Sequence, residues 1–211
     1  MFTGIVQGIA RIQSIDTGKD FKTFTIQFPE KSLIALKKGA SIAINGTCLT
    51  ATQADIIKSV AKFDVIQETL SVTTLDRLQH DDQINFERAA KFGDEIGGHL
   101  MSGHIHATVR VNRVITSKDN HSIYFETPPK YQRYLFTKGF AGLNGCSLTL
   151  GEVNNKEFSV HLIPETLGMT TFKKITEGNY VNLEIDSQTQ SIVDTVSRIL
   201  EEQKLEEQKE N

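Results

Sequence analysis

The chain has 211 residues, of which 38% are hydrophobic and 23% are charged, and its formal net charge is -3 at pH 7. This composition indicates a globular protein of one or two domains. It argues against a general nucleic-acid binder, which carries a basic stripe, and no apolar stretch approaches the roughly 20 residues of a membrane span. Residues 1–4 carry no basic region and no cleavage signal, so we expect a cytoplasmic protein without a membrane or nucleic-acid partner.

Short strands dominate residues 1–187. Residues 21–28 alternate between polar and apolar side chains, as a half-buried strand does. Residues 41–44 form a short strand that enters the turn dipeptide Asn45-Gly46. Further strands are predicted at residues 106–115, 122–126, 158–163 and 181–185. Many short strands with Gly and Asn turns indicate small antiparallel barrels, which close on themselves and leave no exposed edge.

Two short helical pieces are predicted, at residues 29–36 and 129–136. Each opens on a proline, which suits the first turn of a helix, and each precedes a Lys-Gly pair.

The tail from Thr189 onward is predicted to be an amphipathic helix. Val193, Val196 and Leu200 follow a three-four spacing, and charges fill the remaining face. Two interpretations stay open, an oligomerisation stem and a helix packed on its own barrel. The narrow apolar stripe favours the stem.

The first half of the chain is repeated in its second half, at an offset near 98 residues. I-N-G-T-C-L-T at residues 44–50 returns as L-N-G-C-S-L-T at 143–149, and N-F-E at 85–87 returns as N-L-E at 182–184. A repeat of this length is a whole small domain. We therefore predict an all-β protein of two similar domains followed by the tail helix, with boundaries at residues 1–97, 98–187 and 188–211.

Cys48 and Ser147 occupy aligned positions in the two copies, each between a turn and a Leu-Thr pair. A cysteine with a lowered pKa is a nucleophile, whereas a lone cysteine is more often a small buried apolar residue. The polar residue in both copies keeps the functional interpretation open. Cys48 and Cys146 also lie at nearly equivalent positions, but without a secretory signal we expect no disulfide.

Residues 97–106, G-G-H-L-M-S-G-H-I-H, hold half of the six histidines. His99, His104, His106 and Cys48 are competent zinc ligands, but their spacing fits no closed structural site, so no metal is predicted. His104 and His106 alternate along an expected strand and share one face, and the glycines indicate close backbone approach. A base or hydrogen-bond donor is favoured, and a solvated histidine is the alternative.

The repeated E-T-L followed by T-T, at residues 68–74 and 165–171, has two interpretations. Ser and Thr cap helices, so the motif could be structural. It could equally supply hydroxyls and backbone groups to a polyol or a heterocycle. Lys138 and Asp186 are ordinary by themselves. The sequence holds no signature of dinucleotide, ATP or common hydrolase sites.

Five motifs, M-F-T-G-I-V, N-G-T-C-L-T, G-G-H-L-M-S-G-H, N-G-C-S-L-T and L-I-P-E-T-L, resemble riboflavin synthase of the alpha-chain type along essentially the whole chain. The resemblance implies two six-stranded Greek-key barrels and a C-terminal helix that forms a homotrimer. It implies dismutation of two 6,7-dimethyl-8-ribityllumazine molecules to riboflavin and 5-amino-6-(ribitylamino)uracil, without cofactor or metal. Association with a lumazine synthase shell is left open.

The resemblance also implies the residues of the site, which lies between neighbouring subunits. The first pocket takes Gly4, Ile5, Val6, Cys48, Leu49, Thr50, Asp64, Val65, Ile66, Gln67, Glu68, Thr69, Gly103, His104 and Ile105. The second takes Lys138, Ser147, Leu148, Thr149, Leu162, Ile163, Pro164, Glu165, Thr166 and Leu167. Catalytic or near-catalytic positions are Phe2, Ser41, Cys48, His104, Ser147 and Asp186.

From the resemblance we expect Cys48 or Ser147 to act through an activated thiol or hydroxyl, or to stabilise an anion. We expect His104 to transfer protons. Asn144 departs from the family, which usually has Asp there, and this puts the orientation of Ser147 or of a ribityl hydroxyl in question. Relatives that bind lumazine or flavin as optical antennae are the second interpretation, and a pure interaction protein is the third.

Overall fold

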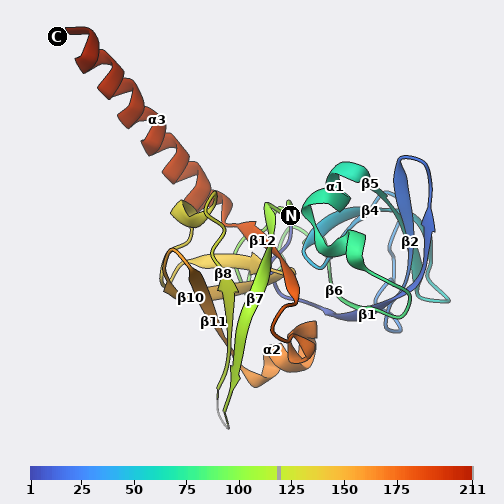
Figure 1. The fold of residues 1–211 in the computed structure, drawn as a ribbon. Coiled ribbons are helices and arrows are strands. Elements are labelled where there is room, and N and C mark those ends of the chain that lie inside the picture. The colour runs from blue at the N-terminus through green and yellow to red at the C-terminus, as the bar shows by residue number, and fades with distance from the viewer. Residues whose placement is uncertain (118–119, 211) are drawn as a thin grey trace.

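The computed structural model, which describes residues 1–117 and 120–210, consists of two closed antiparallel barrels and a long C-terminal helix (Figure 1). The first barrel contains β1 (Gly8–Thr17), β2 (Phe21–Gln27), β3 (Ser41–Ile44), β4 (Thr47–Asp55), β5 (Val60–Ile66) and β6 (Gln83–Arg88). The second contains β7 (Ala107–Thr116), β8 (His121–Glu126), β9 (Phe140–Leu143), β10 (Cys146–Val153), β11 (Glu157–Leu162) and β12 (Tyr180–Ile185). The strand order is β1-β2-β5-β4-β3-β6 in the first barrel, and the second repeats it strand for strand. The predicted all-β fold is confirmed.

Each barrel encloses its own apolar core. In the first, Phe24, Ile26 and Phe63 are at most 1% exposed, as the alternation along β2 requires. In the second, Phe125 and Phe158 stack with ring centroids 5.2 Å apart. Two closed cores of this kind leave the outer faces of the strands free to build sites.

The two predicted helical pieces are wrong. Residues 30–35 form turns, in which Lys31 and Ala35 take φ angles of 65° and 58° that no right-handed helix allows. Residues 129–136 contain only the 3-10 turn η2 (Gln132–Tyr134). Proline at the start of a turn gives the same local signal as proline at the start of a helix.

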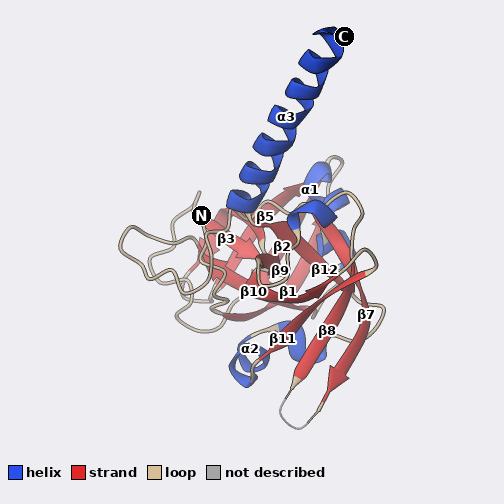
Figure 2. Cartoon of the chain, turned by 90° about the vertical axis from the view of Figure 1, so that its left-hand side faces the viewer, coloured by secondary structure: helices blue, strands red, loops and turns tan. Residues whose placement is uncertain are grey.

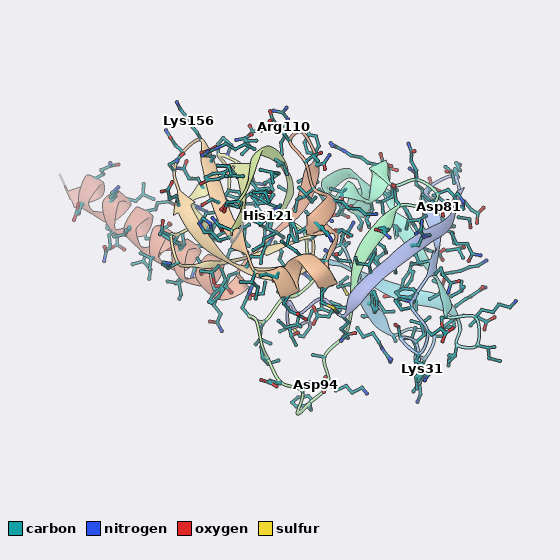
Figure 3. All side chains as sticks on the ribbon, turned by 90° about the horizontal axis from the view of Figure 1, so that it is seen from below. Lys31, Asp81, Asp94, Arg110, His121 and Lys156 are labelled. Atoms are coloured by element: carbon teal, nitrogen blue, oxygen red, sulfur yellow. The ribbon has the colours of Figure 1, made fainter. Side chains whose placement is uncertain are left out.

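Short helices instead follow β5 and β11, and the two copies match. They are α1 (Gln67–Val72) with the 3-10 helix η1 (Thr74–Arg77), and α2 (Pro164–Met169) with η3 (Thr171–Lys174). The connection between the barrels, residues 89–106, loops away from both of them around Asp94 (Figure 3).

The Asn-Gly turns of the two barrels meet face to face. A Cβ added to Gly46 would lie 2.6 Å from the backbone nitrogen of Gly145, so neither turn tolerates a side chain there. Fully buried asparagines bond across the contact: Nδ2 of Asn85 donates to the carbonyl of Asn144 (3.0 Å), and Nδ2 of Asn182 donates to the carbonyl of Asn45 (2.8 Å). The reciprocal bonds relate the barrels by a pseudo-two-fold axis.

Helix α3 (Ser187–Glu210) points away from both barrels (Figures 1 and 2). Only its first turns touch the second barrel, where Val193 packs against the core and Asp194 accepts a hydrogen bond from Tyr134. Ile192 is 65% exposed and Leu200 is 51% exposed. The interpretation that this helix packs along its own barrel is therefore wrong. No helix among the described residues is long and apolar enough to cross a membrane.

Candidate active site

The segment that precedes each barrel crosses to the other barrel. Phe2 and Met101 form an antiparallel bridge, from which the two segments diverge. The Ser147 N–H donates to the carbonyl of Gly4 (2.8 Å), and the Cys48 N–H donates to the carbonyl of Gly103 (2.8 Å). Each candidate nucleophile therefore lies against backbone from the opposite repeat.

This crossing corrects the first predicted pocket. Gly103 lies beside Cys48 as expected, but Gly4 lies against Ser147, and Val6 is buried in the core of the second barrel. Residues 4–6 therefore belong with the second site. The prediction failed for residues 4–6 because it kept them with the barrel that follows them, although it placed residues 103–105 across the repeat.

The contacts at these crossings are close. Gly4 and Gly103 have φ angles of +73° and +80°, and an added Cβ would lie 2.5 Å from the Cβ of Ser147 or of Cys48. At Gly98 an added Cβ would lie 2.4 Å from the carbonyl oxygen of Thr3. The close backbone approach expected from the glycines is confirmed.

Two buried carboxylates, which the sequence interpretation missed, fasten the crossing segments. Glu87 Oε1 accepts hydrogen bonds from the Thr3 N–H (2.6 Å) and the Thr3 hydroxyl (2.8 Å). Glu184 Oε1 accepts the same pair of bonds from Ser102, at 2.7 and 2.8 Å. Burial raises the pKa of both carboxyls, against the opposing effect of these hydrogen bonds. The signal was present in the repeated N-F-E and N-L-E, which place both glutamates on equivalent strands.

Cys48 lies on the outer face of the β3–β4 hairpin. Ser41 pairs with Thr50 and Ala43 pairs with Cys48, so these four side chains share that face. Phe2 is 1% exposed and packs in a cluster with Ala43, Met101 and Cys48. It therefore supports the wall behind Cys48 and does not reach solvent.

Strands β4 and β5 are not paired beside Cys48, and we call this unpaired stretch the gap beside Cys48. Their pairing starts at Ala51 and Phe63. Residues 48–50 on one strand and 64–66 on the other are therefore not paired with each other. Of the predicted residues that flank this gap or follow it in α1, Leu49 and Val65 are buried, Thr69 is half-buried, and Thr50, Asp64, Ile66, Gln67 and Glu68 are exposed.

The second barrel has the same gap beside Ser147, because the β10–β11 pairing starts at Leu150 and Val160. Leu148 and Leu162 are buried, Thr166 and Leu167 are half-buried, and Thr149, Ile163, Pro164 and Glu165 are exposed. Lys138 lies at the repeat position of Gly39, where it adopts φ 69° against 87° for the glycine. This φ lies in the left-handed region that favours glycine.

Ser147 is hydrogen-bonded to His99, a residue that the sequence interpretation did not select. Its hydroxyl lies 2.6 Å from Nδ1 of His99, and the ring stacks on Phe140 with centroids 5.5 Å apart. Burial lowers the pKa of His99, and the negative charge of Asp186 opposes this. The neutral ring is therefore the form that faces Ser147.

Asp186 caps helix α3. Its Oδ2 accepts hydrogen bonds from the Thr189 N–H (2.9 Å) and hydroxyl (2.6 Å). Burial acts to raise the pKa of Asp186, but these bonds and a further one from the Gln188 backbone outweigh it, so the pKa is lowered. An ionised Asp186 thus caps α3, and its charge acts on His99 at the second site.

The predicted pairing of His104 and His106 on one strand face is wrong, because β7 starts at Ala107. His104 is exposed, and its backbone N–H donates to the Ser102 hydroxyl (3.1 Å). His106 is turned against α3, with Nε2 3.1 Å from the Gln190 side chain. In the described part of the chain, no group of three or more His, Cys, Asp or Glu side chains could hold a metal ion. Ile105 is half-buried between the two histidines.

The first threonine of each T-T pair is a cap. Thr73 accepts a hydrogen bond from the Leu75 N–H, and Thr170 accepts one from the Phe172 N–H, both at 3.3 Å. The structural interpretation of that half of the motif is thus confirmed.

Asn144 serves the contact between the barrels. Its Oδ1 accepts a hydrogen bond from the Asn182 N–H (2.9 Å), as Asn45 does from Asn85. An aspartate would accept the same bond, so the departure from the family leaves this contact in place.

The fold and the sequence both match known proteins. Residues 3–89 and 102–186 match the lumazine binding domain family, so the chain falls in the class of proteins built from two such domains. It is 51% identical over 201 residues to the riboflavin synthase of Escherichia coli (strain K12), which spans 95% of this chain and 93% of that protein. It is 43% identical over 200 residues to the riboflavin synthase of Chlamydia pneumoniae, with 95% and 97% covered. The chain belongs to the riboflavin synthase family.

Solved structures give the same fold. The crystal structure of LumP complexed with 6,7-dimethyl-8-(1'-D-ribityl) lumazine matches with a TM-score of 0.79 and 25% identity over 88% of this chain and 99% of that one. LumP complexed with riboflavin matches with a TM-score of 0.81 and 26% identity over the same shares.

Proposed function

We propose that this protein catalyses the dismutation of two 6,7-dimethyl-8-ribityllumazine molecules. A four-carbon unit passes from one molecule to the other, which yields riboflavin and 5-amino-6-(ribitylamino)uracil. The protein is thus a transferase of riboflavin biosynthesis. The observation that carries this function is the 51% identity to a riboflavin synthase over 95% of the chain.

The two equivalent gaps suit a reaction between two copies of one molecule. We assign one lumazine to the gap beside Cys48 and one to the gap beside Ser147, where the strands separate before Ala51 and Leu150. Unpaired strand edges offer backbone donors and acceptors to a heterocycle with alternating N–H and C=O groups. Holding the rings in contact makes the encounter effectively unimolecular, which is a large part of the rate.

The chemistry needs a proton removed from the C7 methyl of one lumazine and a nucleophile at C7 of the other. The hydroxyl of Ser147 is suited to the second task, because it lies 2.6 Å from Nδ1 of His99, which can accept its proton in the tautomer that carries the hydrogen on Nε2. Cys48 occupies the equivalent place in the first barrel, where no histidine of residues 1–117 and 120–210 bonds to it. The different environments of Cys48 and Ser147 support different roles for the two barrels.

We further propose that neighbouring protomers of a homotrimer bring the two lumazines together. Helix α3 supports this assembly, because it extends from the barrels with an exposed apolar stripe that includes Ile192, Val196 and Leu200. A stripe of this width is typical of a coiled-coil seam. Both cysteines are free thiols, which supports a reducing, cytoplasmic compartment.

An antenna protein is the second candidate, because the LumP structures hold 6,7-dimethyl-8-ribityllumazine or riboflavin on the same fold. Turnover separates the two. The purified protein is incubated with 6,7-dimethyl-8-ribityllumazine and no added cofactor, and riboflavin is followed by fluorescence and chromatography. Riboflavin formed with an equal amount of the uracil product supports the enzyme. Bound lumazine that is recovered unchanged supports the antenna.

Variants then test the site. Cys48→Ser and Ser147→Ala should each lower turnover while lumazine binding to the other barrel persists. Cys146→Ala is the matched control, because burial raises the pKa of that thiol to about 12 and it faces the core. Full turnover in Cys48→Ser would remove Cys48 from the mechanism.

A further inference from the structure

A groove of about 700 Å³ runs between the two barrels, away from both lumazine gaps. Its walls come in pairs from the two repeats, so it lies along the pseudo-two-fold axis. The pairs that matter here are Asn45 with Asn144 and Arg77 with Lys174. A polar groove of this volume is large enough for a small ligand.

The floor of the groove presents hydrogen-bond donors that the protein does not use. Asn45 and Asn144 are each only 5% exposed. Their Oδ1 atoms are occupied, because each accepts the backbone N–H of Asn85 or Asn182 at 2.9 Å. Both side chains line the groove, and no hydrogen bond of either Nδ2 is found among the described residues. Neither Nδ2 is among the buried atoms that lack a partner, so both amides open onto the groove. Two amide donors that open onto one groove can bond an acceptor placed between them.

The rim adds positive charge. Arg77 at the end of η1 lies over the ring of Tyr180, 3.8 Å from its centroid. Lys174 at the end of η3 has no ion-pair partner in the described part of the chain. Two carboxylates also line the groove, but both are engaged. Asp81 is bonded to Arg11 (3.5 Å), and Asp82 accepts a hydrogen bond from the Gln79 N–H (2.8 Å). The groove cations without a carboxylate partner in the described part of the chain are therefore Arg77 and Lys174, one from each repeat.

We propose that this groove is a binding site for a phosphate group. The two Nδ2 amides of Asn45 and Asn144 bond its oxygens from below, and Arg77 and Lys174 neutralise its charge from the rim. Amide donors and two cations without a carboxylate partner favour an oxyanion over a cation. The site is separate from the lumazine gaps and does not depend on their occupancy.

The test uses the full-length protein and inorganic phosphate, titrated at constant ionic strength by calorimetry and by the line width of the phosphorus resonance. We expect saturable binding of one phosphate per chain. Arg77→Ala and Lys174→Ala should each weaken binding about tenfold, the usual size of one charge-assisted hydrogen bond. Lys173→Ala is the control, because that lysine is exposed one residue away and does not line the groove.

Asn144→Asp makes the sharpest variant. The carboxylate keeps the acceptor for the Asn182 N–H, so the thermal midpoint should hold, but it replaces a donor with a negative charge and should abolish phosphate binding. Saturating riboflavin should leave phosphate bound. Three results overturn the proposal: no saturable binding to the unmodified protein, unchanged affinity in Asn144→Asp and Lys174→Ala, or displacement of phosphate by riboflavin.

Discussion

Replacing Glu184 with alanine should damage the Cys48 site without touching it. Glu184 is 2% exposed and accepts hydrogen bonds from the N–H and hydroxyl of Ser102 and from the N–H of Gly103, which lies 3.2 Å from both carboxylate oxygens. The carbonyl of Gly103 in turn accepts the bond from the Cys48 N–H. The substitution therefore frees the segment that forms one side of the first site.

The magnitude follows from the donors left behind. A buried donor without an acceptor costs about 1–3 kcal/mol, and two backbone N–H groups, of Ser102 and Gly103, lose theirs. Water that enters the vacated space and the removal of a buried charge recover part of this. We expect Glu184→Ala to lower the free energy of unfolding by about 2–4 kcal/mol. Glu184→Gln keeps one acceptor oxygen and should cost about 1 kcal/mol.

Urea denaturation gives the free energy of unfolding, and the lumazine assay gives turnover. Both variants should lose turnover, by roughly tenfold or more in Glu184→Ala, because the wall beside Cys48 moves. Glu87→Ala is the matched variant for the other site, since it frees Thr3 and Gly4, and the carbonyl of Gly4 accepts the Ser147 N–H. A Glu184→Ala protein with unchanged unfolding free energy and full turnover would refute the proposal that Glu184 holds Ser102 and Gly103 in place.

Acid pH provides an independent check on Glu184. Burial raises the pKa of its carboxyl above 4.5, so the folded protein holds this proton more tightly than the unfolded chain. The stability linked to that proton is fully present below pH 4.5 and is lost as the pH rises through the folded pKa. The difference in unfolding free energy between the unmodified protein and Glu184→Gln should therefore be larger at acid pH than at neutral pH. An equal difference at both would contradict the raised pKa.

Three further predictions test other parts of the structure. Burial lowers the pKa of His99 below 6.5, so the unfolded chain takes up a proton first as the pH falls, and the free energy of unfolding drops below pH 6.5. His99→Gln should flatten that drop, as measured by urea titrations at several pH values. The variant should also lower turnover, because it loses the bond to Ser147. Gly46→Ala should lower the unfolding free energy by roughly 2 kcal/mol or more, since φ is +80° and the added methyl meets the backbone of Gly145; an unchanged melting temperature would mean that the barrels do not touch there. If the proposed homotrimer forms through α3, Leu200→Glu should give a smaller species in analytical ultracentrifugation while each barrel stays folded, and an unaltered sedimentation coefficient would exclude α3 from that interface.

The barrels were predictable because their signals are local. Alternation along residues 21–28 set the buried face, and the Asn-Gly turns at residues 45–46 and 144–145 marked the hairpins. The helical pieces failed for the same reason, since a proline followed by polar residues suits a turn as well as a helix. Positive φ angles at Lys31 and Ala35 decided between them, and nothing in those side chains announces this.

The candidate site was only partly predictable, because its key contacts join residues far apart in sequence. Cys48 and Ser147 could be selected from the repeat, whereas His99 gains its meaning from a hydroxyl 48 residues away. Gly4 was assigned to the wrong barrel because its sequence does not show whether the segment stays with the barrel that follows it or crosses to the other one. Ser147 and Cys48 each bond to backbone of the opposite repeat, so these contacts form only when both barrels fold against each other.

The crossed segments make each barrel depend on the other. A single barrel lacks the strip of backbone that completes its own pocket, so one barrel cut from this chain would need the N-terminal segment of a second copy to complete it. One polypeptide supplies both segments, and the two equivalent positions differ, with a thiol in one barrel and a histidine-bonded hydroxyl in the other.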